Sequence, residues 1–192
     1  MFDFFYQVFM ILCRGKGLSM RLFIAVNFTQ ETKNRLAALS VALQSRSTQG
    51  NFCAPDNFHL TLAFLGECGV KQAREAEYIV EHTYFDSFLL TVDHFGRFIK
   101  GTDIWWAGIK KTNDLVDLHQ KVNKKLINAS FILDNRPFSP HITLGREVIT
   151  NIYPWKIEPF HQDVNCIHLM KSERIGGRLT YTSLCRNSNT HD

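Results

Sequence analysis

The tetrapeptide His59-Leu60-Thr61-Leu62 occurs a second time as His141-Ile142-Thr143-Leu144. In both copies a polar residue alternates with an aliphatic one, and a period of two is typical of a β-strand. In a strand the histidine and the threonine of each copy point to one face, while the two aliphatic side chains point to the other. Each copy therefore presents an imidazole beside a hydroxyl, above two side chains that can anchor the strand in a core.

The two copies lie 82 residues apart, at 59 and 141, and the surrounding sequence keeps the same register. The shift superimposes residues of like chemistry outside the motif: Phe23 on Trp105, Ala25 on Ala107, Leu36 on Leu118 and Pro55 on Pro137. Each half is expected to run strand, helix, proline-marked turn and then motif strand. A long period with two copies predicts two related lobes rather than a solenoid.

Length and composition set the limits of the architecture. The chain has 192 residues, of which 45% are hydrophobic and 16 are Phe. That is enough for a substantial core in one domain, or in two small lobes that share one core region. The formal net charge of +4 suits an anionic substrate, but it fits an ordinary soluble protein equally well.

The cysteines indicate neither a disulfide framework nor a zinc knuckle. Their number is odd, and no Cys-x-x-Cys occurs: Cys13, Cys53, Cys68, Cys166 and Cys185. This usage is typical of a reducing cytoplasm, with small apolar side chains scattered through a core.

The first 19 residues do not match the rest of the chain. The apolar run at 4–13 is too short to span a bilayer, which takes about 20 residues. It follows Asp3 and precedes the basic residues, the reverse of a signal peptide. We expect the functional chain to begin at Met20, with 1–19 as an upstream extension; a peripheral membrane anchor is the alternative. The fold would then be a single two-lobed domain over 20–186, followed by a disordered tail at 187–192.

Hydrophobic periodicity predicts the remaining elements. The expected helices are one capped by Thr29 with Leu36, Leu39 and Leu43 on its apolar side, one at about 70–83 and one at about 113–128. The expected strands are 21–27, 58–65, 88–92, 95–99, 104–110, 164–170 and 179–185, the last two joined by a turn at Gly176 and Gly177.

The paired His-x-Thr-x motifs resemble those of the two-histidine (2H) phosphoesterase superfamily. Their surroundings resemble the RNA 2′,3′-cyclic phosphodiesterases, also called the 2′-5′ RNA ligase family. The resembling segments are Arg-Leu-Phe-Ile-Ala-Val at 21–26, Pro-Asp-Asn-Phe-His-Leu-Thr-Leu-Ala-Phe-Leu-Gly at 55–66, Trp-Ala-Gly at 106–108 and Arg-Pro-Phe-Ser-Pro-His-Ile-Thr-Leu-Gly-Arg at 136–146. The resemblance covers roughly 20–185. It implies a bilobal α+β fold with two antiparallel sheets, outer helices and the active cleft between two pseudo-symmetric lobes.

The resemblance also implies the chemistry. The family hydrolyses RNA or nucleotide 2′,3′-cyclic phosphates to 2′-phosphates without a metal or a cofactor, and reversible 2′-5′ ligation is a further activity left open. His59 would donate a proton to the leaving 3′ oxygen, and His141 would accept a proton from water. The sequence itself does not assign which histidine is acid and which is base. An ordinary imidazole pKa near 6.5 lets both forms coexist near neutrality.

Three further residues are expected to bind the substrate. Thr61 and Thr143 would hydrogen-bond the non-bridging phosphate oxygens. Arg146 resembles the family's phosphate-contacting arginine. Strict alternation from His141 places Arg146 on the Leu144 face, so reaching the phosphate requires a β-bulge, a strand end or the length of the side chain.

Other readings of the same residues stay open. A mononuclear metal site is weak, because each motif supplies a threonine and no second ligand at a helical or turn spacing. A non-catalytic module that binds RNA ends and a 2H phosphodiesterase for another cyclic nucleotide are the remaining alternatives. The expected partner is RNA with a 2′,3′-cyclic phosphate end or a cyclic nucleotide, with no membrane, and the protein is expected to be a cytoplasmic monomer.

Overall fold

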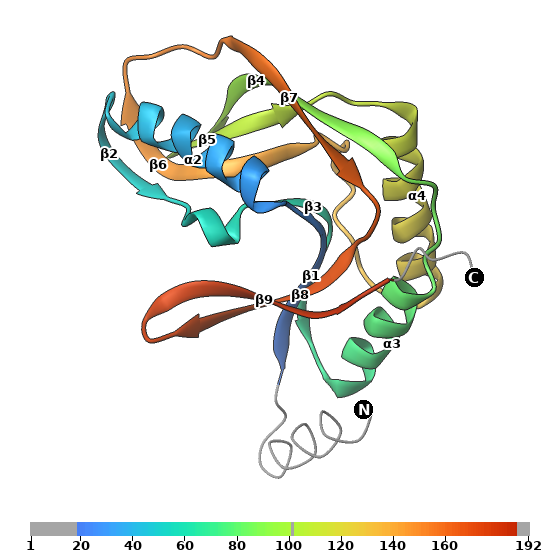
Figure 1. Cartoon of the computed structure of the whole chain (residues 1–192). Helices are drawn as coiled ribbons and strands as arrows, with labels where there is room; N and C mark the ends of the chain where they lie inside the picture. Colours follow the sequence, from blue (N-terminus) through green and yellow to red (C-terminus); the bar gives the residue numbers. More distant parts are fainter. Residues whose placement is uncertain (1–18, 101, 188–192) are drawn as a thin grey trace.

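The computed structural model describes residues 19–100 and 102–187, which form strands, α-helices and a short 3₁₀ helix (Figure 1). In chain order the elements are β1 (Met20–Asn27), α2 (Gln30–Gln44), β2 (Ser47–Phe52), η1 (Pro55–Asn57), β3 (His59–Cys68), α3 (Val70–Glu81), β4 (Phe88–Lys100), β5 (Thr102–Ile109), α4 (Asn113–Asn128), β6 (His141–Thr150), β7 (Lys156–Val164), β8 (His168–Ile175) and β9 (Arg178–Arg186).

The strands build two antiparallel sheets, which confirms the expected α+β bilobal fold. One sheet has the order β3-β1-β8-β9 and the other β2-β6-β5-β4-β7. The shift of 82 maps β1 onto β5 and β3 onto β6, bound for bound. β1 pairs with β3, and β5 pairs with β6. The repeat in the sequence is therefore a repeat of strand pairs, with one motif strand in each sheet.

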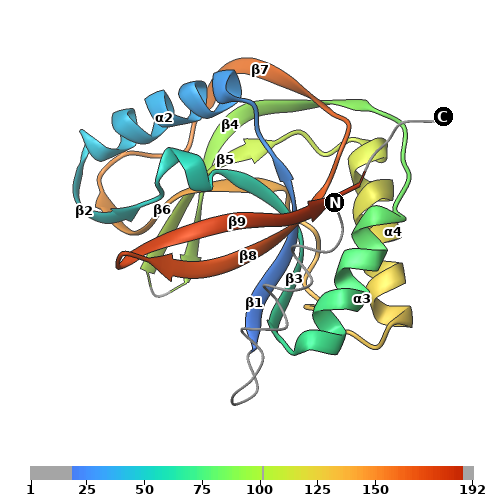
Figure 2. The same cartoon turned by 60° about the horizontal axis from the view of Figure 1, so that its bottom comes forward.

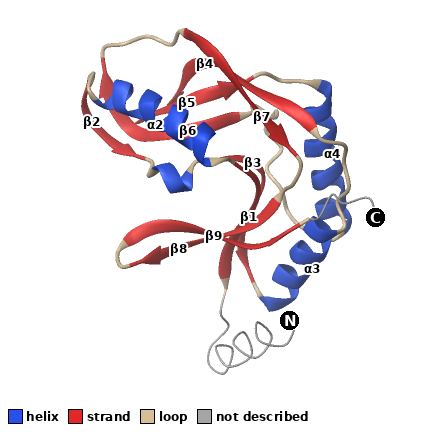
Figure 3. Cartoon of the chain, viewed as in Figure 1, coloured by secondary structure: helices blue, strands red, loops and turns tan. Residues whose placement is uncertain are grey.

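Helices α2 and α4 each pack against the sheet that contains the motif strand of the other half of the sequence. Helix α2, from the first half of the chain, packs against β2, β6 and β7 of the five-stranded sheet. Helix α4 packs mainly against β3 of the four-stranded sheet, beside α3. Figure 3 shows α3 and α4 together along one sheet and α2 alone on the other. Each sheet is therefore covered by a helix from the half of the sequence that does not supply its motif strand, so the lobes are not contiguous halves of the chain.

The helices begin and bury their side chains as the periodicity predicts. The Thr29 hydroxyl accepts from the backbone N–H of Thr32 (3.2 Å) and caps α2. Every apolar position expected on the inner side of α4 is buried: Leu115, Leu118, Val122 and Leu126. Helix α3 buries Ala73, Ala76, Ile79 and Val80, and it ends at Glu81, two residues before the expected end.

Strand β1 is buried on both faces. Leu22, Ile24 and Val26 join the main core. On the other face Phe23 and Ala25 form a small cluster with Met170 and Tyr181, under the cleft between the lobes. The seven residues at 21–27 show no alternation, and the sequence therefore predicts a strand buried on both faces. The strand is buried because β1 lies between β3 and β8 in its sheet.

Several strand boundaries differ from expectation. Strands β2 and β7 were not predicted. The two runs at 88–92 and 95–99 are one strand, β4, whose register shifts between Val92 and His94. The expected strand at 164–170 divides, because Val164 ends β7 and β8 begins at His168. β2 and β7 are edge strands rich in polar residues, so pairing with a neighbour rather than local propensity forms them.

The chain ends were expected to lie outside the fold. Of the extension expected at 1–19, residues 1–18 lie outside the described residues. Asn187, expected in the tail, is instead 1% exposed. Its Nδ2 donates to the Thr83 carbonyl (2.8 Å), and its Oδ1 accepts from the Ile167 N–H (2.7 Å). The fold thus extends at least to Asn187. Within residues 19–100 and 102–187, no helix has the length and hydropathy needed to cross a bilayer.

Candidate active site

A cleft of about 690 Å³ separates the two motif strands. Its walls come from β1 and β3 on one side, β2 and β6 on the other, and the β8–β9 hairpin. Figure 2 shows that hairpin facing β2 and β6. All five predicted site residues line this one cleft: His59, Thr61, His141, Thr143 and Arg146.

The His59 imidazole is held by the backbone just before it. Its Nδ1 lies 2.7 Å from the Asn57 carbonyl oxygen. Because a carbonyl only accepts, Nδ1 carries the proton, and the neutral ring presents the Nε2 lone pair. Nε2 lies 3.1 Å from the Thr61 hydroxyl oxygen. The rings of Phe23 and Tyr181 pack on the imidazole with centroids 4.8 and 5.0 Å away.

His141 is held in the same way. Its Nδ1 donates to the Ser139 carbonyl oxygen at 2.7 Å, and Ser139 is the residue that the shift of 82 places on Asn57. The Phe98 ring stands edge-on to the imidazole, with centroids 5.0 Å apart. The two strands therefore present the same tautomer, with an unprotonated Nε2 in both; in His59 this nitrogen accepts from the Thr61 hydroxyl.

A β-bulge follows the threonine in each motif strand. Opposite β1, the partners step from Thr61 to Ala63, so Leu62 has no partner. Opposite β5, they step from Thr143 to Gly145, so Leu144 has none. Leu62 and Leu144 are also related by the shift of 82, so the β-bulge is part of the structural repeat. A bulge of this kind inverts the alternation of the residues after it.

The second bulge brings Arg146 to the cleft. Leu144 and Gly145 both face the core, and a Cβ on Gly145 would lie 2.9 Å from Val148 Cγ2. The next residue, Arg146, is therefore on the cleft face and lines the cavity. The sequence required a bulge, a strand end or a long reach at this point, and the structure has the bulge.

The equivalent position in the first motif strand is Phe64. Its side chain also lines the cleft and is 47% exposed. The Arg21 guanidinium, from β1, lies 4.9 Å from the centre of the Phe64 ring. One motif strand thus brings its own positive charge, whereas the other brings an aromatic ring and relies on its neighbour for charge.

Burial and positive charge favour neutral imidazoles in the free cleft. Burial lowers the pKa of His59 below 6.5; the Asn57 carbonyl raises this pKa, and the charges of His141 and Arg146 lower it further. Burial likewise lowers the pKa of His141; the Ser139 carbonyl raises it, and Arg146 lowers it again. A bound phosphate anion would act in the opposite direction and raise both pKa values.

The lining is rich in guanidinium groups. Arg21, Arg146, Arg174 and Arg178 all line the cleft, and none of its described lining residues is Asp or Glu. This charge suits a polyanion and offers no carboxylate to a metal. In the described ranges, one group of three possible metal ligands has its ligand atoms within 4.8 Å of one another. It consists of Glu77, Glu81 and Cys185 and lies outside the cleft.

The cleft also holds a thiol, which is unsuited to nucleophilic catalysis. Burial raises the pKa of Cys53 to about 11, and Arg146 lowers it only in part. The group therefore stays protonated near neutrality, and the thiol form is a poor nucleophile.

Asn57 is a positioning residue that the sequence did not reveal. Its side chain is buried, donates from Nδ2 to the Leu179 carbonyl (2.8 Å) and accepts at Oδ1 from the Tyr181 N–H (3.2 Å). One residue thus ties β9 to the cleft while its own carbonyl orients His59. The Pro-Asp-Asn turn was visible in the sequence, but the partner strand is more than 120 positions away.

Two aromatic residues near the motif strands belong to the core rather than to the cleft. Phe58 is 1% exposed and Trp105 is 0% exposed. Phe138 stacks on His119 with ring centroids 3.8 Å apart. Neither Phe58 nor Trp105 is therefore exposed to stack on a base.

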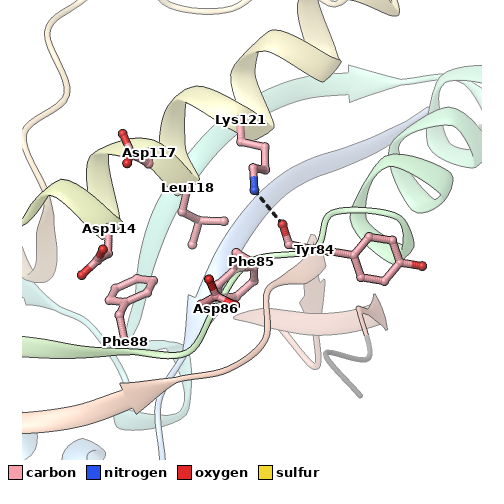
Figure 4. Close-up of a pocket in the computed structure, with 8 residues that line it drawn as sticks. All are labelled: Tyr84, Phe85, Asp86, Phe88, Asp114, Asp117, Leu118 and Lys121. Carbon is pink, nitrogen blue, oxygen red and sulfur yellow. Dashed lines mark hydrogen bonds between the residues drawn. The ribbon is translucent and has the colours of Figure 1, made fainter. Parts of the chain in front are cut away.

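A second hollow, of about 320 Å³, lies between α4 and residues 84–88 (Figure 4). Lys121 closes it by donating to the Tyr84 carbonyl oxygen at 2.8 Å. Lys125 donates in the same way to the His82 carbonyl. These two lysines hold the segment after α3 against α4.

Comparisons with known proteins agree with this geometry. A model described as LigT like Phosphoesterase matches residues 26–105. An RNA 2′,3′-cyclic phosphodiesterase of Thermotoga maritima is 32% identical over 76% of this chain and 78% of its own length. One of Escherichia coli is 29% identical over 66% of this chain and 72% of its own.

Solved structures agree as well. The crystal structure of E. coli LigT complexed with 3′-AMP superimposes with a TM-score of 0.77 at 27% identity, over 88% of this chain and 97% of that one. The chain therefore belongs to the LigT-like phosphoesterase family.

Proposed function

We propose that this protein hydrolyses 2′,3′-cyclic phosphates at RNA ends and leaves the phosphate on the 2′ oxygen. The observation that carries the proposal is the pair of imidazoles in one cleft. Each is held through Nδ1 by the carbonyl two residues earlier, so that each has an unprotonated Nε2. The relatives compared above are named for this activity.

Acid/base catalysis by the two histidines follows from their protonation. Hydrolysis of the cyclic ester needs a water deprotonated on one side of phosphorus and the 3′ oxygen protonated on the other. A charge on His141 lowers the pKa of His59, so the pair favours one shared proton over two. One imidazole and one imidazolium are the forms that the reaction requires. In our assignment His141 accepts the proton from water, and His59 donates to the 3′ oxygen.

The neighbouring groups would stabilise the phosphorane-like transition state. Thr61 and Thr143 stand two residues after each histidine and can donate to the non-bridging oxygens. Arg146 reaches the same cleft through the bulge. Donors fixed before the reaction act on charge as it develops and need no reorganisation. These roles for the three residues are part of the proposal.

Metal independence is also part of the proposal, because the cleft offers imidazole, hydroxyl and guanidinium groups without a carboxylate. Ligation would be the reverse reaction, with the two histidines exchanging roles. We further propose a monomer in the cytoplasm. The support for that compartment is that the cysteines at 53, 68, 166 and 185 are free thiols.

The test is turnover of an RNA oligonucleotide with a 2′,3′-cyclic phosphate end, in the presence of EDTA, followed by phosphorus NMR of the product. We expect a 2′-phosphomonoester at an undiminished rate. Loss of turnover with EDTA would support the metal site instead. Binding without product would support the RNA-end-binding module, and turnover of a 3′,5′-cyclic nucleotide alone would support a different cyclic substrate.

A further inference from the structure

The β8–β9 hairpin projects beyond its sheet as a two-stranded arm. β8 pairs with β1 only between His168 and Ser172. Beyond Ser172 the hairpin strands pair only with each other, as far as Ile175 opposite Arg178. Gly176 and Gly177 close the turn with φ of +57° and +81°, a conformation that favours glycine. The arm is seen extending past β1 in Figure 2.

The two faces of this arm carry different chemistry. On one face Glu173 is engaged by Lys171 (2.7 Å) and by the Thr182 hydroxyl (3.3 Å). The opposite face contributes Arg174 to the cleft lining, and Arg178, which pairs with Ile175 beside the turn, also lines the cleft. The arm's carboxylate is thus satisfied away from the cleft, and its guanidinium groups are turned toward it.

Both arginines are available to an anionic ligand. Arg174 donates from Nη1 to the Gly177 carbonyl oxygen (2.9 Å). That bond holds the side chain over the turn and leaves other guanidinium N–H groups for a ligand. No ion pair recorded within the described ranges involves Arg174 or Arg178, whereas Arg35, Arg97 and Arg136 each have a carboxylate partner.

The cleft carries more positive charge than a cyclic phosphate needs. A 2′,3′-cyclic phosphate has one negative charge, and Arg146 stands in the same strand as His141 and Thr143 to meet it. Arg174 and Arg178 come from a separate element, the arm that faces β2. In RNA each further nucleotide adds one phosphate, and guanidinium groups are well matched to phosphates. The surplus charge therefore suits a chain of nucleotides rather than a single one.

We propose that Arg174 and Arg178 hold the backbone phosphates upstream of the cyclic end, so that the preferred substrate is an RNA oligonucleotide rather than a cyclic mononucleotide. This inference rests on the proposed function. The contact is electrostatic and lies away from the reacting phosphorus, so it acts on binding of longer substrates and carries no sequence preference.

The experiment compares a 2′,3′-cyclic mononucleotide with a tetranucleotide that bears the same cyclic end. For the wild type we expect kcat/KM to be at least tenfold higher on the tetranucleotide and to fall more steeply with salt. In the double variant Arg174→Gln/Arg178→Gln, that preference should shrink at least tenfold, mainly through KM. The salt dependence should weaken by about 0.7 of a log unit per lost phosphate contact.

Two controls make the result specific. The double variant Arg35→Gln/Arg46→Gln changes the net charge equally outside the cleft and should keep the wild-type preference. The double variant Arg174→Lys/Arg178→Lys keeps the charge and should retain part of the preference for the tetranucleotide. Equal kcat/KM of the wild type on both substrates would overturn the inference while leaving the proposed function intact, as would an undiminished preference in the Gln variant. Turnover of neither substrate would overturn both.

Discussion

The two motif strands, β3 with His59 and β6 with His141, share the same backbone arrangement around the histidine but differ in the neighbouring side chains. Both have the carbonyl that holds Nδ1, the threonine and the bulge. His59 packs against Phe23 and Tyr181 and bonds to Thr61. His141 instead has Arg146 in its own strand.

This difference indicates how a repeated frame can support unlike roles. The position after the bulge is Arg146 in one strand and Phe64 in the other, so positive charge is concentrated in the His141 strand. Arg146 lowers the pKa of His141, second only to burial among the influences that do so. Arg146 lowers the pKa of His59 as well, after burial and His141. The neutral imidazole is the form that accepts a proton, so this charge is compatible with His141 as the base, and the assignment itself follows the family resemblance.

The largest expected effect comes from removing either imidazole. His59→Ala and His141→Ala should each lower kcat by roughly 10²–10⁴-fold, the range for a lost acid/base group. The pH profiles should separate the two roles: loss of the base removes the fall in activity at low pH, and loss of the acid removes the fall at high pH. His82→Ala, outside the cleft, is the control. A wild-type rate in either cleft variant would refute that histidine's role.

The next effect tests the asymmetry after the bulge. Arg146→Ala should lower kcat/KM by about 10²-fold, because it removes a preorganised donor to the phosphate. Phe64→Ala, at the equivalent position, removes no charge and should cost much less. Steady-state kinetics on one oligonucleotide substrate measure both. Equal losses would mean that the two strands contribute alike and that the asymmetry has no catalytic meaning.

A third pair of variants compares the residues that hold the two imidazoles. Asn57→Ala keeps the backbone carbonyl but leaves the Leu179 carbonyl and the Tyr181 N–H without their partner. The expected cost is about 1–3 kcal/mol in the free energy of unfolding. Ser139→Ala, in the equivalent exposed place, should change it by less than about 0.5 kcal/mol. Urea denaturation measures the free energy of unfolding of both variants. Similar losses in the two would contradict the anchoring role of Asn57.

The smallest expected effect is on the pH dependence of the free energy of unfolding. Because burial lowers the folded-state pKa of His59, the unfolded chain binds its proton more readily. The resulting stability is present above the unfolded pKa near 6.5 and is lost as the pH falls toward the folded pKa. His59→Gln should flatten the dependence of the unfolding free energy between pH 7 and pH 5. An unchanged slope would show that His59 is not buried as a neutral group.

The motif strands and the buried sides of the helices could be predicted from sequence, because they depend on local hydrophobic patterns. The alternation in the motifs placed β3 and β6, and the apolar spacing in 113–128 placed α4 and its buried side. The repeat placed His59 and His141 in comparable positions. Arg146 was assigned to the cleft only through the resemblance, and alternation alone would have put it in the core.

What could not be predicted depends on long-range pairing. Nothing in the periodicity of 30–44 says that α2 packs on the sheet that contains β6. β2, with Gly50 inside it, has little strand propensity of its own and forms by pairing with β6. The contribution of Asn57 required knowing that β9 passes beside it. An apolar face can be recognised from sequence, whereas its partner is fixed by the assembled sheets.

The central claim is that both imidazoles flank a single phosphorus atom. The most direct test follows the two imidazole Cε1–H NMR signals against pH, with and without a 2′-nucleotide monophosphate. We predict that both pKa values start below 6.5 and that both rise when the phosphate binds. A rise at only one of the two histidines, or at neither, would contradict the claim.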